Sequence, residues 1–184
     1  DLHLLRAWKI ANPDIGLVIA AGSPDEPGIG QEISALIKEL QTNRSNIWWF
    51  EKMLPQPELI ALLSHADFFI CPSIYEPLGI VNLEAMACET AVLASDVGGI
   101  PEVVIDHETG ELVHYPSALD RDATSRDDEF EAALASKIRH FSQRPELLEK
   151  YGKAGRKRAI AEFSWQTIAS QTITLYSDLI SQSK

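Results

Sequence analysis

The stretch covering residues 67–96 constrains the fold more than any other, because its pattern changes from strand to helix and back to strand. Four consecutive apolar residues, Phe68–Cys71, indicate a strand that is buried on both faces. Turn residues follow as far as Gly79, the spacing becomes helical from Ile80, and a further apolar run begins at Ala91. A buried strand, a glycine-bearing loop and a helix in this order predict a crevice that main-chain amides face.

The start of this predicted helix favours an anion. Free N–H groups around Gly79 and Ile80 and the positive end of the helix dipole attract a phosphate, and Gly79 allows its close approach. Glu76 precedes the helix, and Glu84 lies more than one turn inside it. Because carboxylates repel phosphate, we expect them to accept hydrogen bonds from hydroxyls on either side of it, as in a sugar nucleotide. The stripe expected to face inward, away from Glu84, is Ile80, Leu83 and Ala87.

The rest of the chain continues the alternation of strands and helices. This order predicts one α/β domain over residues 1–184, Rossmann-like, with a mainly parallel sheet and helices on both faces. Beyond the stretch above, strands are expected at 15–21 and 46–50, a loop at 24–30 and helices at 31–41 and 58–65. An acidic loop at 117–128 should precede carboxy-terminal helices at about 128–142, 145–162 and 165–181.

Charge and composition exclude several functions. The net charge of −11, with no basic stripe, argues against binding to nucleic acid or to an anionic membrane, and no apolar run is long enough to span a membrane. Gly28 and Gly30 lack the third glycine of a dinucleotide fingerprint, so NAD binding is rejected. No His, Cys or Asp cluster has the spacing of metal ligands, and Cys71 and Cys88 are expected to be reduced core thiols, so we expect a cytoplasmic protein without a metal.

The sequence EPLGIVNLEAMA at 76–87, with Ala94-Ser95 and GGIPEVV at 98–104 after it, resembles the Glu-x7-Glu signature of retaining family 4 glycosyltransferases. The resemblance covers nearly the whole chain as the carboxy-terminal, donor-binding domain of a GT-B fold, in which two Rossmann-like domains face each other across a cleft. Within the family, the chain is most similar to bacterial glycogen synthases. It departs from many relatives at Glu89-Thr90-Ala91, where they have Gly-Thr-Pro, so the resemblance leaves the shape of this loop open.

The resemblance also implies roles for individual residues. Glu76 is the catalytic candidate and would contact hydroxyls of the transferred sugar near the anomeric centre, while Glu84 would hold the ribose hydroxyls. Main-chain amides of Leu78, Gly79 and Ile80 would bind the sugar and the diphosphate. The other donor-binding candidates are Met53 and Leu54, expected beside the nucleotide base, and Gly22 and Ser23, which follow a predicted strand.

The function implied is transfer of glucose from ADP-glucose or UDP-glucose to an α-glucan, as in glycogen synthase, with retained configuration and without a metal or cofactor. In the family, the strand and loop before this segment carry the Arg and Lys that bind diphosphate. We expect that strand, which would lie in the middle of the sheet, to be missing from this chain. We expect the acceptor-binding amino-terminal domain to be missing too, and the chain alone would then be inactive. The alternatives are a GT-B sugar-nucleotide epimerase and a non-catalytic module that binds nucleotide sugars.

Overall fold

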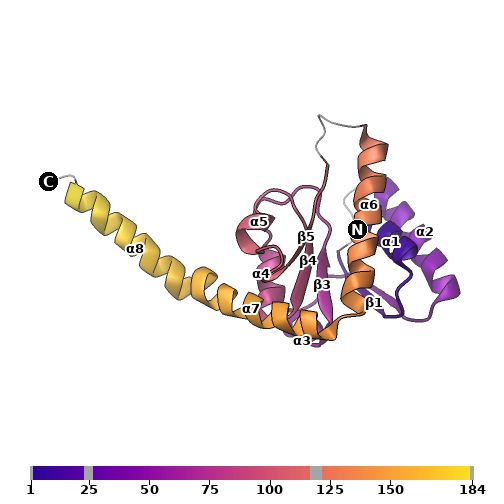
Figure 1. Cartoon of the computed structure of the whole chain (residues 1–184), viewed down its shortest axis with the longest axis horizontal. Coiled ribbons are helices and arrows are strands. Elements are labelled where there is room, and N and C mark those ends of the chain that lie inside the picture. Colours follow the sequence, from indigo (N-terminus) through magenta and orange to yellow (C-terminus); the bar gives the residue numbers. More distant parts are fainter. Residues whose placement is uncertain (1, 23–26, 117–121, 183–184) are drawn as a thin grey trace.

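A computed structural model describes residues 2–22, 27–116 and 122–182 as an α/β domain (Figure 1). Its short strands alternate with helices from the first element to β5, and helices alone form the remainder. The strands are β1 (Leu17–Ala20), β2 (Ile47–Phe50), β3 (Phe68–Cys71), β4 (Ala91–Ser95) and β5 (Gly110–Val113). The helices are α1 (Leu2–Ala11), α2 (Pro27–Asn43), α3 (Gln56–His65), α4 (Ile80–Ala87), α5 (Ile100–Val103), α6 (Ala123–Ser142), α7 (Pro145–Phe163) and α8 (Trp165–Gln182).

All strand pairs are parallel, but they form two sheets. One contains β1 and β2, and the other has the order β3-β4-β5. Within the described residues, β1 pairs only with β2 and β3 pairs only with β4, so each sheet keeps an open edge there. Because parallel strands run in one direction, the loops that follow β3 and β4 leave the sheet at the same edge, where α/β folds bind ligands.

Strand β4 lies between two hydrophobic cores, and all of its residues are buried. Successive side chains of a strand point to opposite faces. Ala91 and Leu93 accordingly join the core formed with α1, α2 and α6, whereas Val92 and Ala94 join the core formed with α4, α5 and α7. Figure 1 shows α1, α2 and α6 on one side of β3–β5 and α4 and α5 on the other. The predicted fold class, a parallel α/β domain with helices on both faces, is confirmed.

The prediction was wrong about two helix starts. Helix α2 begins at Pro27, so residues 27–30 are helical and not part of a loop; proline suits the first helical turn because its missing N–H has no partner there anyway. Helix α6 begins at Ala123, inside the segment expected to be a loop up to residue 128. Its start is fixed by Asp122, whose side chain accepts a 2.9 Å hydrogen bond from the amide of Ser125.

Helix α8 projects away from the rest of the domain (Figure 1). None of its residues is buried, and Trp165 at its start is 86% exposed. The large apolar side chains that it exposes are Trp165, Ile168, Ile173, Leu175, Tyr176, Leu179 and Ile180. In the described part of the chain, no helix has the length and apolar character that crossing a membrane requires.

Candidate functional site

The loop between β3 and α4 ends at Gly79, which caps the helix with φ 86° and ψ 50°. This left-handed conformation is accessible to glycine without strain and costs other residues energy. The amide of Gly79 donates a 3.2 Å hydrogen bond to Oε1 of the half-buried Glu76. No described residue accepts a hydrogen bond from the next two amides, those of Ile80 and Val81. The end of this loop therefore presents two unpaired N–H groups, and the carboxylate of Glu76 lies beside them.

A second loop, at the end of β4, packs against the loop between β3 and α4. The amide of Gly99 donates a 3.0 Å hydrogen bond to the carbonyl oxygen of Glu76. A Cβ atom on Gly98 would lie 1.9 Å from that same oxygen, and one on Gly99 would lie 2.3 Å from the carbonyl oxygen of Pro77. The two main chains therefore touch directly, which requires glycine at both positions.

Ser95, at the last position of β4, fixes the beginning of the same loop. Its side chain is fully buried, and its hydroxyl lies 3.4 Å from the carbonyl oxygen of Cys71 and close to that of Ser73. Those carbonyls belong to the last residue of β3 and to the loop after it. Hydrogen bonds from β4 and its following loop thus hold the Glu76 loop at both ends.

The orientation of α4 differs from the prediction. Ile80 is 62% exposed and Ala87 is exposed, so the expected inward stripe is wrong at these two positions, whereas Leu83 is half-buried and packs against the core. The buried face is formed by Asn82, Ala85 and Met86, because α4 packs against β4 and α7. Residues four apart lie on one face of a helix, so Glu84 shares the exposed side with Ile80 instead of lying opposite it.

The remaining candidates lie on loops that follow other strands. Gly22 comes after β1, is exposed and has open space where a Cβ would be. Met53 and Leu54 come after β2, and Met53 is 85% exposed while Leu54 is half-buried. Leu78, in the Glu76 loop, is 38% exposed. Ser23 lies outside the described residues. No ligand contact tests any of these roles, and they stay predictions.

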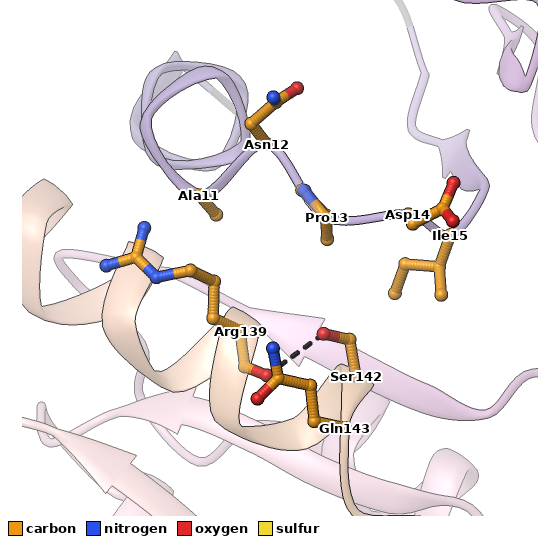
Figure 2. A pocket seen from close by; sticks show the side chains of 8 residues that line it. All are labelled: Ala11, Asn12, Pro13, Asp14, Ile15, Arg139, Ser142 and Gln143. Carbon is orange, nitrogen blue, oxygen red and sulfur yellow. Dashed lines mark hydrogen bonds between the residues drawn. The ribbon is translucent and has the colours of Figure 1, made fainter.

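A pocket of about 280 Å³ lies elsewhere, between the α1–β1 connection and the end of α6 (Figure 2). Its lining includes Arg139, which donates a 3.2 Å hydrogen bond to the carbonyl oxygen of Ile10, and Ser142, which donates one of 3.0 Å to the carbonyl oxygen of Arg139. None of the predicted site residues lines it. The described residues include no group of three or more His, Cys, Asp or Glu side chains that could hold a metal ion.

Comparison with protein families identifies the chain. Residues 2–158 match the family described as "Glycosyl transferases group 1". The chain belongs to this family. The match includes the β3–α4 loop and the Gly98–Gly99 turn that supports it. Two residues near the site of this group 1 domain were not singled out from the sequence. They are Asn82, which is buried at the start of α4, and Ser95, which anchors the Glu76 loop.

Two relatives match different shares of the chain. An alpha-maltose-1-phosphate synthase of Mycolicibacterium smegmatis is 50% identical over 174 residues, which are 95% of this chain and 43% of the relative. A glycogen synthase of Mycobacterium tuberculosis is 37% identical over 123 residues, which are 67% of this chain and 27% of the relative. The group 1 domain therefore spans less than half the length of these relatives.

Solved structures show the same fold. A sucrose-phosphate synthase of Thermosynechococcus elongatus superposes with a TM-score of 0.76 at 32% identity, over 98% of this chain and 42% of the other. The Anabaena protein HepE, solved in complex with UDP-glucose, superposes with a TM-score of 0.74 at 19% identity, over 95% and 44%. The group 1 domain thus has the α/β architecture of a GT-B glycosyltransferase domain.

Proposed function

We propose that the protein to which this domain belongs is a retaining glucosyltransferase, and that the domain binds the nucleotide-activated glucose. The observation that carries the proposal is the start of α4, where the amides of Ile80 and Val81 have no acceptor among the described residues and Glu76 lies beside them. Such a helix start suits a diphosphate, and a neighbouring carboxylate suits sugar hydroxyls. HepE, which shares this fold, has been solved in complex with UDP-glucose, a donor of the proposed kind.

The reaction exchanges one bond to the anomeric carbon for another. The bond between that carbon and the diphosphate oxygen breaks, and a hydroxyl oxygen of the acceptor bonds to the carbon from the same face. The hydroxyl proton passes to the leaving phosphate, whose growing negative charge is stabilised by the amides at the start of α4. We assign Glu76 a hydrogen-bonding role toward the sugar, although a carboxylate could also attack the anomeric carbon as a nucleophile.

The roles proposed for the other donor-binding candidates assume that the diphosphate binds at the start of α4. Glu84 lies one turn beyond Ile80 on the exposed side of α4, within the range of a ligand that extends past the diphosphate toward its ribose. Gly22 offers an uncrowded main chain after β1, and Met53 and Leu54 would lie beside the base. Ser23 is proposed as a minor phosphate contact. The chemistry proposed here uses neither a metal ion nor a cofactor.

For the acceptor, we propose a phosphorylated glucose in preference to an α-glucan. The relative at 50% identity is named for making α-maltose 1-phosphate, a disaccharide phosphate that glucosyl transfer to glucose 1-phosphate would produce. The glycogen synthase is 37% identical over a shorter part of the chain, so glucan elongation is the second candidate. Both acceptors use the same donor site, and the part of the protein outside this domain would select between them.

We further propose that this other part docks on α8. Helix α8 exposes its large apolar side chains, although a helix in a folded protein normally buries one such face. An acceptor-binding domain that packs against α8 would cover this surface and close a cleft over the start of α4. The domain alone would then bind nucleotide weakly and show no turnover.

The test uses the full-length enzyme with radiolabelled ADP-glucose and UDP-glucose, each offered with glucose 1-phosphate or with a glucan. We expect a labelled, phosphorylated disaccharide from one of the two donors. Labelled glucan in its place would establish the glycogen synthase alternative. An epimeric nucleotide sugar formed without acceptor would establish an epimerase, and nucleotide-sugar binding without any product would establish a binding module.

A further inference from the structure

The side chain of Asn82 is completely buried and has no hydrogen-bond partner in the described part of the chain. It is 0% exposed, and neither its Nδ2 nor its Oδ1 has a partner among residues 2–22, 27–116 and 122–182. Both halves of this carboxamide are therefore unpaired, which costs stability that an apolar side chain would not cost. Buried polar side chains in folded proteins are nearly always paired, and exceptions concentrate at functional sites.

The position of Asn82 connects it to the candidate site. It is the third residue of α4, directly above the capping residue Gly79. A Cβ atom placed on Gly79 would lie 2.6 Å from Nδ2 of Asn82 and 3.6 Å from Cγ of Glu76. The side chains of Asn82 and Glu76 thus converge on Gly79, although they come from the helix and from the loop before it.

The third residue of a helix commonly accepts a hydrogen bond from the amide of the capping residue. In this structure that amide is already used, because Gly79 N–H donates to Oε1 of Glu76 at 3.2 Å. Asn82 has the chemistry to replace Glu76, since a half-turn of its carboxamide exchanges nitrogen and oxygen and presents an acceptor. Asn82 is therefore a second residue beside Gly79 that can offer an acceptor, and in this structure the Gly79 amide is bonded to Glu76.

We propose that Asn82 is a positioning residue that accepts the Gly79 N–H when the Glu76 carboxylate turns to the hydroxyls of a bound sugar. This inference rests on the proposed function. Without Asn82, release of Glu76 would leave a buried amide unpaired, and the cost would oppose sugar binding in the reactive position. The nucleoside diphosphate alone does not recruit Glu76, so its binding does not depend on the exchange.

The test compares Asn82→Leu in the full-length enzyme with wild type. Leucine has the same number and branching of side-chain heavy atoms, removes both unpaired polar groups and cannot accept a hydrogen bond. We expect kcat/KM for the nucleotide-glucose donor to fall 10- to 100-fold, while the Kd of the nucleoside diphosphate changes less than twofold. We expect the melting temperature to stay equal or to rise. If transfer were lost because the fold was destabilised, the melting temperature would fall instead.

The control is Thr90→Val. Thr90 is also buried, and its hydroxyl donates a 2.6 Å hydrogen bond to the carbonyl oxygen of Leu63, away from Gly79. This variant should lower the melting temperature and keep transfer within twofold of wild type. If Asn82→Leu does not fold, Asn82→Ala replaces it with the same expected separation between transfer and diphosphate binding.

Transfer by Asn82→Leu at the wild-type rate would overturn the inference, as would an equal loss of diphosphate affinity and transfer, because that would indicate a distorted helix start. A structure of the wild-type enzyme with nucleotide-glucose gives a direct readout, and Gly79 N–H still bonded to Glu76 in it would also overturn the inference. Absence of transfer by the wild type with every donor and acceptor would instead refute the proposed function.

Discussion

The amide of Gly99 donates a 3.0 Å hydrogen bond to the carbonyl oxygen of Glu76. Gly98 and Gly99 lie on the loop after β4, and Glu76 lies on the loop after β3, so neighbouring strands of one sheet deliver both partners. Cβ atoms at the two glycines would meet the carbonyl oxygens of Glu76 and Pro77 at 1.9 and 2.3 Å. The position of the candidate catalytic carboxylate therefore depends on the absence of side chains on another loop.

The first prediction concerns Gly98→Ala. The added methyl group would collide with the carbonyl oxygen of Glu76, and the φ of +55° at Gly98 would itself strain alanine. We expect a loss of about 3 kcal/mol in the free energy of unfolding, combining the left-handed strain with the displaced backbone. Urea denaturation measures the loss, and transfer by the full-length enzyme should fall at least tenfold because Glu76 moves with the loop.

The matched control for that change is Gly28→Ala. Gly28 lies in α2, and a Cβ there would meet no atom within 4 Å. Alanine should stabilise the helix by up to about 1 kcal/mol and leave transfer unchanged. Equal effects of the two alanines on stability would contradict the close contact described above.

The second prediction concerns Glu76→Gln. Glutamine keeps the shape of the side chain and an oxygen that can accept from Gly79 N–H, but it removes the negative charge. We expect kcat to fall about 100-fold, the scale of losing one preorganised charged contact at a reacting centre. Calorimetry should find the Kd of the nucleoside diphosphate within twofold of wild type. A variant with normal kcat would remove Glu76 from the chemistry.

The third prediction concerns Glu84→Ala. If Glu84 holds two ribose hydroxyls, its removal should weaken nucleotide binding by about 1.5–3 kcal/mol, or about 10- to 150-fold in Kd, because hydrogen bonds to charged groups are strong. Titration calorimetry with ADP and UDP measures this change. Glu58→Ala, which removes an exposed glutamate from α3, is the control and should leave Kd unchanged. Loss of affinity in both variants would indicate a general charge effect.

The fourth prediction concerns Glu89→Gly. Glu89 has φ 64°, so the chain makes a left-handed turn after α4 although it lacks the glycine expected there from the resemblance. Glycine should relieve about 1 kcal/mol of strain and raise the melting temperature. Glu149→Gly, at the exposed fifth residue of α7, should instead lower stability by about 1 kcal/mol. Destabilisation by both changes would mean that the turn at residue 89 is not strained.

A buried carboxylate provides the basis of the fifth prediction. Glu111, on β5, is 2% exposed and accepts hydrogen bonds from Nζ of Lys137 at 2.5 Å and from the hydroxyl of Tyr151 at 3.2 Å. Ring nitrogens of His140 and His107 lie 3.7 and 3.9 Å from its Oε1. Burial, with the charge and hydrogen bond of Glu111 adding to it, raises the pKa of Tyr151 to about 12.

The consequence is a loss of stability at high pH. Unfolded tyrosine releases its proton near pH 10, whereas Tyr151 in the folded chain keeps it to about pH 12, so the folded state binds one proton more between these values. The free energy of unfolding should therefore fall as pH rises from about 10 to 12, and Tyr151 accounts for about 2 kcal/mol of that fall. Tyr151→Phe should flatten the profile by this amount, whereas Tyr176→Phe, on exposed α8, should not change it.

Sequence reasoning located β3, α3, α7 and α8 well, because their apolar spacing and flanking Pro or Ser residues are local signals. The starts of α2 and α6 were missed, although Pro27 and Asp122 are typical first residues and caps. In both segments, polar composition suggested a loop more strongly than these single residues suggested a helix.

The buried face of α4 was not predictable from hydropathy. Of the predicted stripe Ile80, Leu83 and Ala87, only Leu83 packs inward, and the structure buries the polar Asn82 in place of Ile80. Packing of α4 against β4 and α7 decides this rotation, and packing depends on contacts distant in sequence. The position of Gly79 at the start of α4, with Glu76 in the loop before it, was predicted correctly because the sequence encodes this helix start locally, while the ligand roles of both residues stay predictions.

Strand β4 has an effect on cooperativity that follows from its alternation. Ala91 and Leu93 belong to one core and Val92 and Ala94 to the other, so displacement of this strand would disrupt both cores at once. Thermal denaturation should then appear as a single transition, with equal calorimetric and van't Hoff enthalpies. The loop at the end of β4 would accordingly keep its shape until the whole domain melts, because the strand that anchors it is shared by both cores.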